Sequence, residues 1–114
     1  MKGDGFNLVL NDCKLKIADK PKNVKSLISN LVKITRLKTL GNGDLQKGSK
    51  RVPGYSGTQI IETSHIAVHG FSKENSYIIT IVSCEEFNIG RCIRRLLKIF
   101  KPKYYSITTF KIEI

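Results

Sequence analysis

The spacing of hydrophobic residues predicts two amphipathic helices. The first covers about residues 22–36, where apolar side chains recur at intervals of three and four residues: Val24, Leu27, Ile28, Leu31 and Ile34. Pro21 stands just before it, where a first helical turn tolerates proline. The second helix has the same spacing and ends before Pro102. Its apolar positions are Ile89, Ile93, Leu96, Leu97 and Phe100.

Shorter segments rich in β-branched and aromatic residues predict strands between and around these helices. They cover residues 6–11, 35–40, 58–61 continued by 64–69, 77–83 and 104–112. Residues 41–57, rich in Gly, Lys and Ser, are predicted to form a loop. The order β-α-β-β-β-α-β predicts an α+β fold, a two-layer α/β sandwich whose mostly antiparallel sheet carries two helices on one face. The length of 114 residues suits a single domain over residues 1–114.

The charge of the chain raises the question of a nucleic-acid partner. The formal net charge is +11, and basic residues gather in segments 14–50 and 91–103. Such a balance can indicate nucleic-acid binding. No nucleic-acid-binding motif accompanies the charge, so we favour a solvated basic surface and expect no nucleic-acid partner.

Other features of the composition narrow the class of protein. No apolar run approaches the roughly 20 residues of a membrane span, and residues 1–7 lack the apolar core of a signal peptide. We therefore expect a cytoplasmic protein without a membrane partner. Three cysteines without a CxxC pair indicate reduced thiols. Two histidines and no acidic cluster argue against a metal site.

Two parts of the sequence resemble well-known motifs but do not match them. Residues 43–50 resemble a phosphate-binding loop, but the final Ser49-Lys50 stands in the wrong order and Pro53 follows where a helix should begin. Ser64, His69 and Glu62 suggest a hydrolase triad. The sequence has no G-x-S-x-G elbow, however, and Ser64 lies within a predicted strand rather than on a sharp turn.

Four residues with reactive side chains are more informative as a set: Ser56, Ser64, His69 and Cys84. Each alone has an ordinary structural explanation, such as a turn serine or a buried cysteine. Together they match a family pattern. The segment Thr63-Ser64-His65-Ile66-Ala67-Val68-His69 resembles the self-cleavage strand Glu-Ser-His-Ile-Ser-Ile-His of prokaryotic S-adenosylmethionine decarboxylases.

The resemblance extends over most of the chain. Gly54-Tyr55-Ser56-Gly57 resembles the family's Gly-x-Ser-Gly, and the segment 79–84 resembles the family strand that ends in Thr-Cys. The spacings from Ser56 to Ser64, from Ser64 to His69 and from Ser64 to Cys84 are those of the family without a gap.

The resemblance implies a self-made pyruvoyl cofactor. In this family the serine hydroxyl attacks the preceding carbonyl, here that of Thr63, and elimination then breaks the chain into a β chain of 1–63 and an α chain of 64–114. The new N-terminus, formerly Ser64, becomes a pyruvoyl group whose ketone forms a Schiff base with the substrate amine. Ser56 would act as an oxyanion donor, His69 as the base that takes the Ser64 α-proton, and Cys84 as the acid that protonates the decarboxylated product. The resemblance assigns no role to His65.

The implied activity is decarboxylation of S-adenosylmethionine, which supplies the aminopropyl donor for spermidine synthesis, in a homodimer. Three positions depart from the family. Thr63 replaces a Glu before the cleavage site. Lys73 replaces the Glu that binds the ribose, and Lys cannot accept a hydrogen bond. Ser49 and Lys50 stand where an aromatic ring stacks on adenine.

The altered nucleoside pocket leaves alternatives open. Phe71 and Tyr55 are the nearest aromatic candidates for substrate binding. A pyruvoyl decarboxylase of arginine or ornithine is one alternative, although a basic pocket argues against a dibasic substrate. A non-enzymatic basic RNA-binding protein is another.

Overall fold

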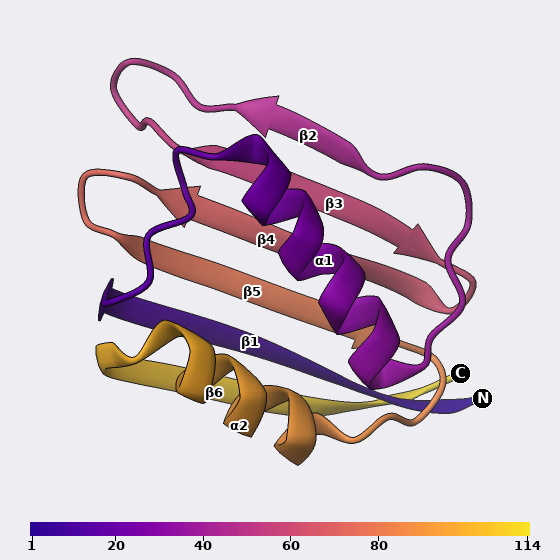
Figure 1. Ribbon diagram of the computed structural model, residues 1–114. Coiled ribbons are helices and arrows are strands. Elements are labelled where there is room, and N and C mark those ends of the chain that lie inside the picture. Colours follow the sequence, from indigo (N-terminus) through magenta and orange to yellow (C-terminus); the bar gives the residue numbers. More distant parts are fainter.

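The computed structural model describes residues 1–114 and contains six strands and two helices. In chain order the elements are β1 (Lys2–Cys13), α1 (Pro21–Thr35), β2 (Asp44–Lys47), β3 (Tyr55–Ile61), β4 (Ser64–Phe71), β5 (Ser76–Ser83), α2 (Ile89–Phe100) and β6 (Pro102–Glu113). All strands join one antiparallel sheet in the order β2-β3-β4-β5-β1-β6. The two termini lie together at one end of this sheet (Figure 1).

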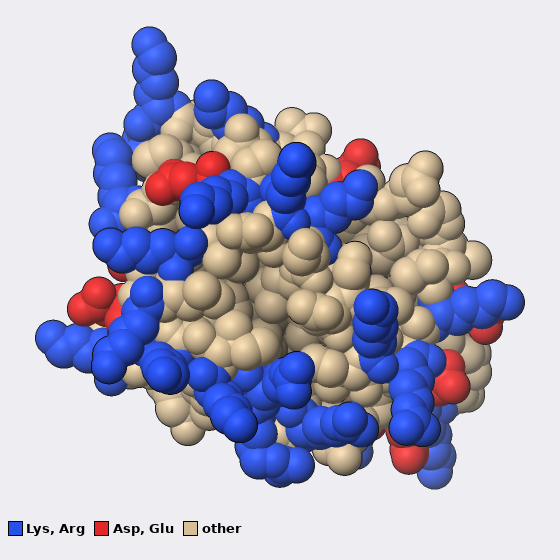
Figure 2. Space-filling view, viewed as in Figure 1, with Lys and Arg blue, Asp and Glu red and all other residues tan.

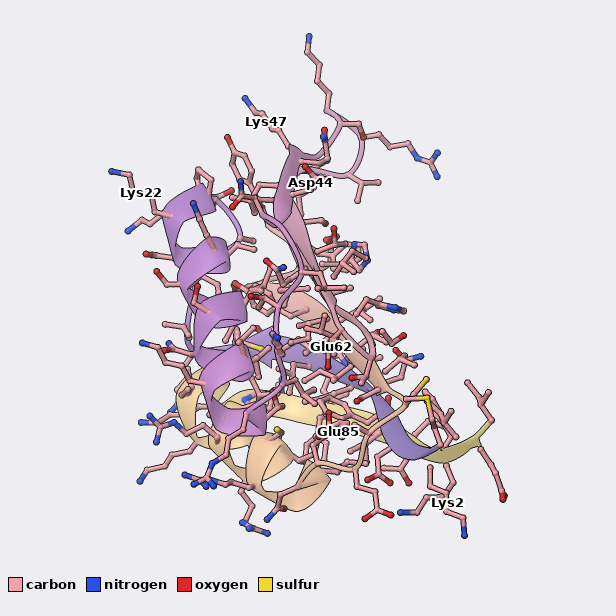
Figure 3. The ribbon with its side chains drawn as sticks, turned by 90° about the vertical axis from the view of Figure 1, so that its right-hand side faces the viewer. Lys2, Lys22, Asp44, Lys47, Glu62 and Glu85 are labelled. Atoms are coloured by element: carbon pink, nitrogen blue, oxygen red, sulfur yellow. The ribbon has the colours of Figure 1, made fainter.

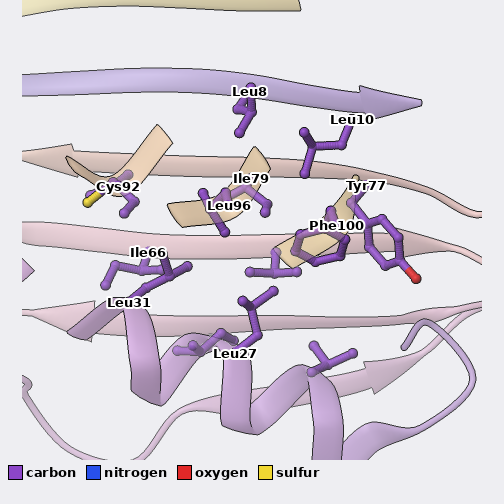
Figure 4. Close-up of a cluster of buried hydrophobic side chains, with 14 of the residues drawn as sticks. Leu8, Leu10, Leu27, Leu31, Ile66, Tyr77, Ile79, Cys92, Leu96 and Phe100 are labelled. Atoms are coloured by element: carbon purple, nitrogen blue, oxygen red, sulfur yellow. The ribbon is translucent and has the colours of Figure 1, made fainter. Parts of the chain in front are cut away.

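Both helices cover the same face of the sheet, and the core lies between the two layers (Figure 1). Leu27 and Leu31 of α1 and Leu96 and Phe100 of α2 point toward side chains such as Ile79 of β5 (Figure 4). The predicted two-layer sandwich, with two helices on one face of an antiparallel sheet, is confirmed. Neither helix has the length and apolar character needed to cross a membrane.

The ends of the helices follow from local sequence. Pro21 occupies the first turn of α1, and Arg36 closes the helix in the left-handed conformation while its N–H donates to the Val32 carbonyl. At the start of α2 the Asn88 side chain accepts the Arg91 N–H. Lys101 ends α2 in the same left-handed way, and Pro102 begins β6 at once.

Several predicted strands need correction. Residues 35–40 do not form a strand: α1 runs through Thr35, and beyond it only Thr39 forms a single bridge, with Ile61. The predicted loop 41–57 contains β2 and the start of β3. Segment 58–69 is not one strand but the hairpin of β3 and β4, which adds a strand to the predicted order. β2 escaped prediction because it is an edge strand in which Leu45 alone is partly buried.

The face of the sheet opposite the helices, here called the outer face, is not covered by this chain. Successive side chains of a strand point to opposite faces, so the residues that alternate with the core residues lie on it. The register joins Ser56 to His69, His69 to Ile78 and Ile78 to Val9 across this face. Its large apolar members include Ile60, Tyr104 and Phe110, of which Ile60 is 55% exposed. The outer face is therefore a substantial surface with apolar side chains in solvent.

Candidate active site

Ser64 begins a strand directly after a sharp turn, whereas the sequence suggested one strand that continued through this position. Glu62 and Thr63 form the two-residue turn between β3 and β4, and Ser64 is the first residue of β4. Its φ is 158°, a conformation that L residues rarely adopt. Strain of this kind is found mostly at functional sites. The exposed end of the hairpin therefore presents the peptide bond between Thr63 and Ser64 in an unusual backbone conformation.

The carbonyl of that peptide bond already accepts a hydrogen bond. The backbone N–H of Cys84 donates to the Thr63 oxygen at 2.8 Å. An N–H aimed at a carbonyl oxygen also stabilises the negative charge that develops there when a nucleophile attacks the carbon. Cys84, which is half-buried, thus lies beside the bond that the sequence predicts to be cut.

Ser83 fixes this arrangement from the buried side. It is fully buried at the end of β5, and its Oγ lies 2.8 Å from Oγ of Thr63. The same Oγ accepts the Glu85 N–H at 3.0 Å. A Cβ on Gly3 of β1 would lie 1.9 Å from the Ser83 carbonyl oxygen, so β1 packs directly against this segment. We call Thr63, Ser64, Ser83 and Cys84 the Ser64 cluster.

Sequence reasoning missed two parts of the Ser64 cluster. The Cys84 donor is a backbone group, which no side-chain motif can reveal. Ser83 did leave a signal: it shares the buried face of β5 with Tyr77, Ile79 and Ile81, where a hydroxyl needs a partner.

Ser56 and His69 form a second group on the outer face. They are paired across β3 and β4, and Nδ1 of His69 lies 3.0 Å from Oγ of Ser56. Ser56 is half-buried and His69 is exposed. We call these two residues the His69 pair. A hydroxyl hydrogen-bonded to an imidazole can donate to an oxyanion while the imidazole exchanges a proton.

Within one chain the Ser64 cluster and the His69 pair lie far apart. Ser64 begins β4 and His69 is five residues further along it, which at about 3.3 Å per residue separates their Cα atoms by about 16 Å. A base must come within about 3 Å of the proton that it takes. His69 therefore does not reach Ser64 of its own chain, which also rules out the hydrolase triad. His65, by contrast, has its Nδ1 3.4 Å from Oγ of Ser64, a long contact.

The residues considered for substrate binding fall on different sides of the sheet. Phe71 follows His69 by two residues on β4, so it shares the outer face with the His69 pair. Tyr55 precedes Ser56 and packs against the core on the helix side. Lys73 is exposed in the turn between β4 and β5, and Lys50 is exposed in the loop between β2 and β3. Phe71 is thus the better placed aromatic residue for a ligand on the outer face.

The three cysteines have different surroundings. Burial raises the pKa of the Cys13 thiol and of the Cys92 thiol to about 11. Both remain protonated at neutral pH and are poor nucleophiles. Only Cys84 is partly accessible, and it alone adjoins the turn at Ser64. The structure contains no group of three side chains able to hold a metal ion.

Comparisons with known proteins show the family and the fold of the chain. Residues 8–112 match the model of the S-adenosylmethionine decarboxylase family. The chain also superposes on the crystal structure of the adenosylmethionine decarboxylase from Aquifex aeolicus VF5 with a TM-score of 0.80 and 15% identity. That match covers 97% of this chain and 90% of the other. No curated protein matches in sequence.

Proposed function

The chain belongs to the S-adenosylmethionine decarboxylase family, and from this we propose that it cuts itself between Thr63 and Ser64 and then decarboxylates S-adenosylmethionine for spermidine synthesis. The observation that carries the proposal is the hydrogen bond of 2.8 Å from the Cys84 N–H to the Thr63 carbonyl oxygen. It lies on the one peptide bond that the reaction must activate.

The first step takes place at the hairpin turn. The Ser64 hydroxyl attacks the Thr63 carbonyl carbon, and the negative charge that forms on the oxygen is held by the Cys84 N–H. The peptide C–N bond then breaks, the nitrogen takes the proton that the hydroxyl gave up, and Thr63 and Ser64 are joined by an ester. Thr63 in place of the family's Glu does not prevent this, because the attacked group belongs to the backbone.

The second step removes the Ser64 α-proton. His69, held by Ser56 at 3.0 Å, is the proposed base, and the ester oxygen leaves with the 1–63 chain. Water then releases the nitrogen as ammonia, which leaves a pyruvoyl group at residue 64. That group supplies an electron sink for the carbanion formed on decarboxylation. The residues fit it, because Ser64 adjoins a turn and the backbone of Cys84 contacts that turn; the partly accessible Cys84 thiol is the proposed acid that returns a proton to the product.

We further propose that the active unit is a homodimer formed by two outer faces. The two-fold axis would lie midway between the two sheets and perpendicular to the strands. The strands of the partner would then run in the opposite direction. The hairpin turn at Ser64 of one protomer then lies opposite the His69 pair of the other, which bridges the separation of about 16 Å along β4. The register pairs Ser64 with Ile61 and Ser83 of the helix side, but Ser64 is the end residue of its strand, and its Oγ lies 3.4 Å from Nδ1 of His65 on the outer face. The exposed apolar residues of the outer face, such as Ile60 and Phe110, would be buried in the same contact. Two equivalent active sites result.

Binding of S-adenosylmethionine requires compensation for two altered positions. Lys73 and Lys50 replace the groups that the family uses for the ribose and the adenine, and each loss removes about 1–3 kcal/mol of binding. We propose that Phe71 compensates by stacking on the adenine. The alternative with a specific observation behind it is a pyruvoyl decarboxylase of arginine or ornithine, because the positions altered are those that bind the nucleoside.

Carbon dioxide release tests the proposed activity. Purified cleaved protein is offered S-adenosylmethionine, arginine, ornithine and lysine in parallel, with Ser64→Ala as the inactive control. We expect release from S-adenosylmethionine, and we expect Phe71→Ala to raise KM for it more than it lowers kcat. Preference for a plain amino acid would establish the alternative, and release from none of the four would refute both substrate assignments.

A further inference from the structure

A basic groove lies between the two helices, on the side of the sheet opposite the His69 pair. Its volume is about 410 Å³, and six residues line it. Two come from α1, Lys33 and Ile34, and four from α2, Arg91, Arg94, Arg95 and Lys98. Five of the six are therefore cations, and they converge from two separate elements onto one concave surface.

The charge of the whole helix layer has a single sign. α1 contains three Lys and α2 contains four Lys or Arg, and neither helix contains Asp or Glu. The structure has two salt bridges, Lys38 with Glu62 and Lys111 with Asp4, and neither involves a groove residue. Figure 2 shows blue side chains standing around this face, with a row of them over α2 at the bottom, and only a few red patches near the edges.

The basic residues of α2 repel one another. Arg91, Arg94, Arg95 and Lys98 are three and four positions apart, so they lie on one face of the helix. Like charges at this spacing destabilise a helix, and no acidic side chain offsets them. An anion in the groove would remove this repulsion.

The groove suits a polymer better than a small molecule. Binding sites for small molecules are lined mostly by apolar side chains, whereas Ile34 is the one apolar residue here. Lys and Arg side chains only donate hydrogen bonds, which suits phosphate oxygens. The groove contains no aromatic side chain, and single-stranded nucleic acids are usually held by stacking on aromatic rings.

We propose that the helix layer binds the phosphodiester backbone of a nucleic-acid duplex, without reading its sequence, through Lys33, Arg91, Arg94, Arg95 and Lys98. The sequence alone argued against a nucleic-acid partner because no motif accompanied the charge. The fold changes that conclusion, since it gathers cations from two distant segments into one groove. The site is independent of the proposed decarboxylation, because it lies on the other side of the sheet.

Fluorescence anisotropy with labelled 24-base-pair DNA and RNA duplexes of two sequences each tests the proposal, on wild type and on uncleaved Ser64→Ala. Five phosphate contacts predict a slope of about −4.5 in log K against log[salt], or about a 500-fold loss between 50 and 200 mM. The triple variant Arg94→Gln, Arg95→Gln, Lys98→Gln should lower that slope by about 2.7.

The matched control removes three charges elsewhere. Lys2, Lys47 and Lys50 are exposed and lie outside the helices, and Figure 3 shows Lys2 and Lys47 away from the helix layer. Their triple change to Gln should weaken binding several-fold less than the groove variant. Equal weakening by the two triple variants, or no salt-dependent binding at 50 mM, would overturn the proposal.

Additional measurements distinguish a nucleic-acid duplex from other anionic ligands and show whether each variant is folded. Displacement of the duplex by micromolar tripolyphosphate would assign the groove to a free polyphosphate, and tighter binding to phosphatidylserine vesicles would assign it to a membrane; either refutes the proposal. Circular dichroism verifies folding. The charge-keeping variant Arg94→Lys, Arg95→Lys should bind within a few-fold of wild type. Should the triple variant not fold, Arg94→Gln alone should lower the slope by about 0.9, and an unchanged slope would count against the groove.

Discussion

Two inactive variants should restore each other if the active site is shared between protomers. Ser64→Ala removes the nucleophile of the Ser64 cluster, and His69→Ala removes the base of the His69 pair. Alone, Ser64→Ala should stay intact, and His69→Ala should stall at the ester, which hydroxylamine then cuts. In a mixed dimer, one of the two sites combines an intact Ser64 from the His69→Ala chain with an intact His69 from the Ser64→Ala chain.

The expected yield follows from the geometry. A single chain separates Ser64 from His69 by about 16 Å along β4, so a chain cannot repair its own site. With equal amounts and random pairing, about half of all dimers are mixed. About half of the His69→Ala chains should therefore mature to pyruvoyl α chains, while Ser64→Ala chains should not be cut at all.

The assay is intact-mass spectrometry after the two variants are unfolded together and refolded, with each variant refolded alone as control. A tag on one variant identifies which chain was cut. Maturation of His69→Ala alone at the wild-type rate would remove His69 from the mechanism. No maturation in the mixture, although mixed dimers are recovered through the tag, would refute the shared site.

Three further predictions concern the cysteines and the Ser64 cluster. Ser83→Ala should slow self-cleavage about tenfold, from the loss of about 1.4 kcal/mol of hydrogen bonding to Thr63, whereas Ser83→Thr should cleave normally; equal rates for both in a time course would exclude positioning by this hydroxyl. Cys84→Ala should cleave but release carbon dioxide about 100- to 10,000-fold more slowly, and unchanged turnover would remove the thiol from the mechanism. Because burial raises the pKa of the Cys13 and Cys92 thiols to about 11 from 9.0, native protein should take up iodoacetamide at Cys84 alone, as read by peptide mapping, and the free energy of unfolding should fall as pH rises from 9 toward 11.

The sequence predicted the helices and the buried strands well because their patterns are regular. The apolar positions that predicted the second helix run from Ile89 to Phe100, which are its first and last residues, and the helix ends before Pro102 as predicted. The edge strand and the turn between β3 and β4 were harder to predict from the sequence. β2 has alternation too weak to distinguish it from a loop, and the turn at Glu62 and Thr63 contains neither Gly nor Pro to mark it.

The sequence predicted the site residues as one set, but the fold places them in two separate groups, the Ser64 cluster and the His69 pair. Spacing along the chain does not reveal that Ser64 and His69 occupy opposite ends of one extended strand. Nor does it reveal that the Cys84 N–H meets the Thr63 carbonyl, because that contact depends on the pairing of Ser64 with Ser83 between β4 and β5. Both facts follow from sheet register, which is a property of the tertiary structure.

The mass of the purified protein tests the central claim most directly. After incubation at neutral pH, denaturing mass spectrometry should find two chains, 1–63 and 64–114, with the second lighter by one ammonia than the product of simple hydrolysis because it begins with a pyruvoyl group. Ser64→Ala should give a single chain under the same conditions. One intact chain from the wild-type protein, or a 64–114 fragment that begins with an ordinary serine, would contradict self-cleavage to a pyruvoyl enzyme.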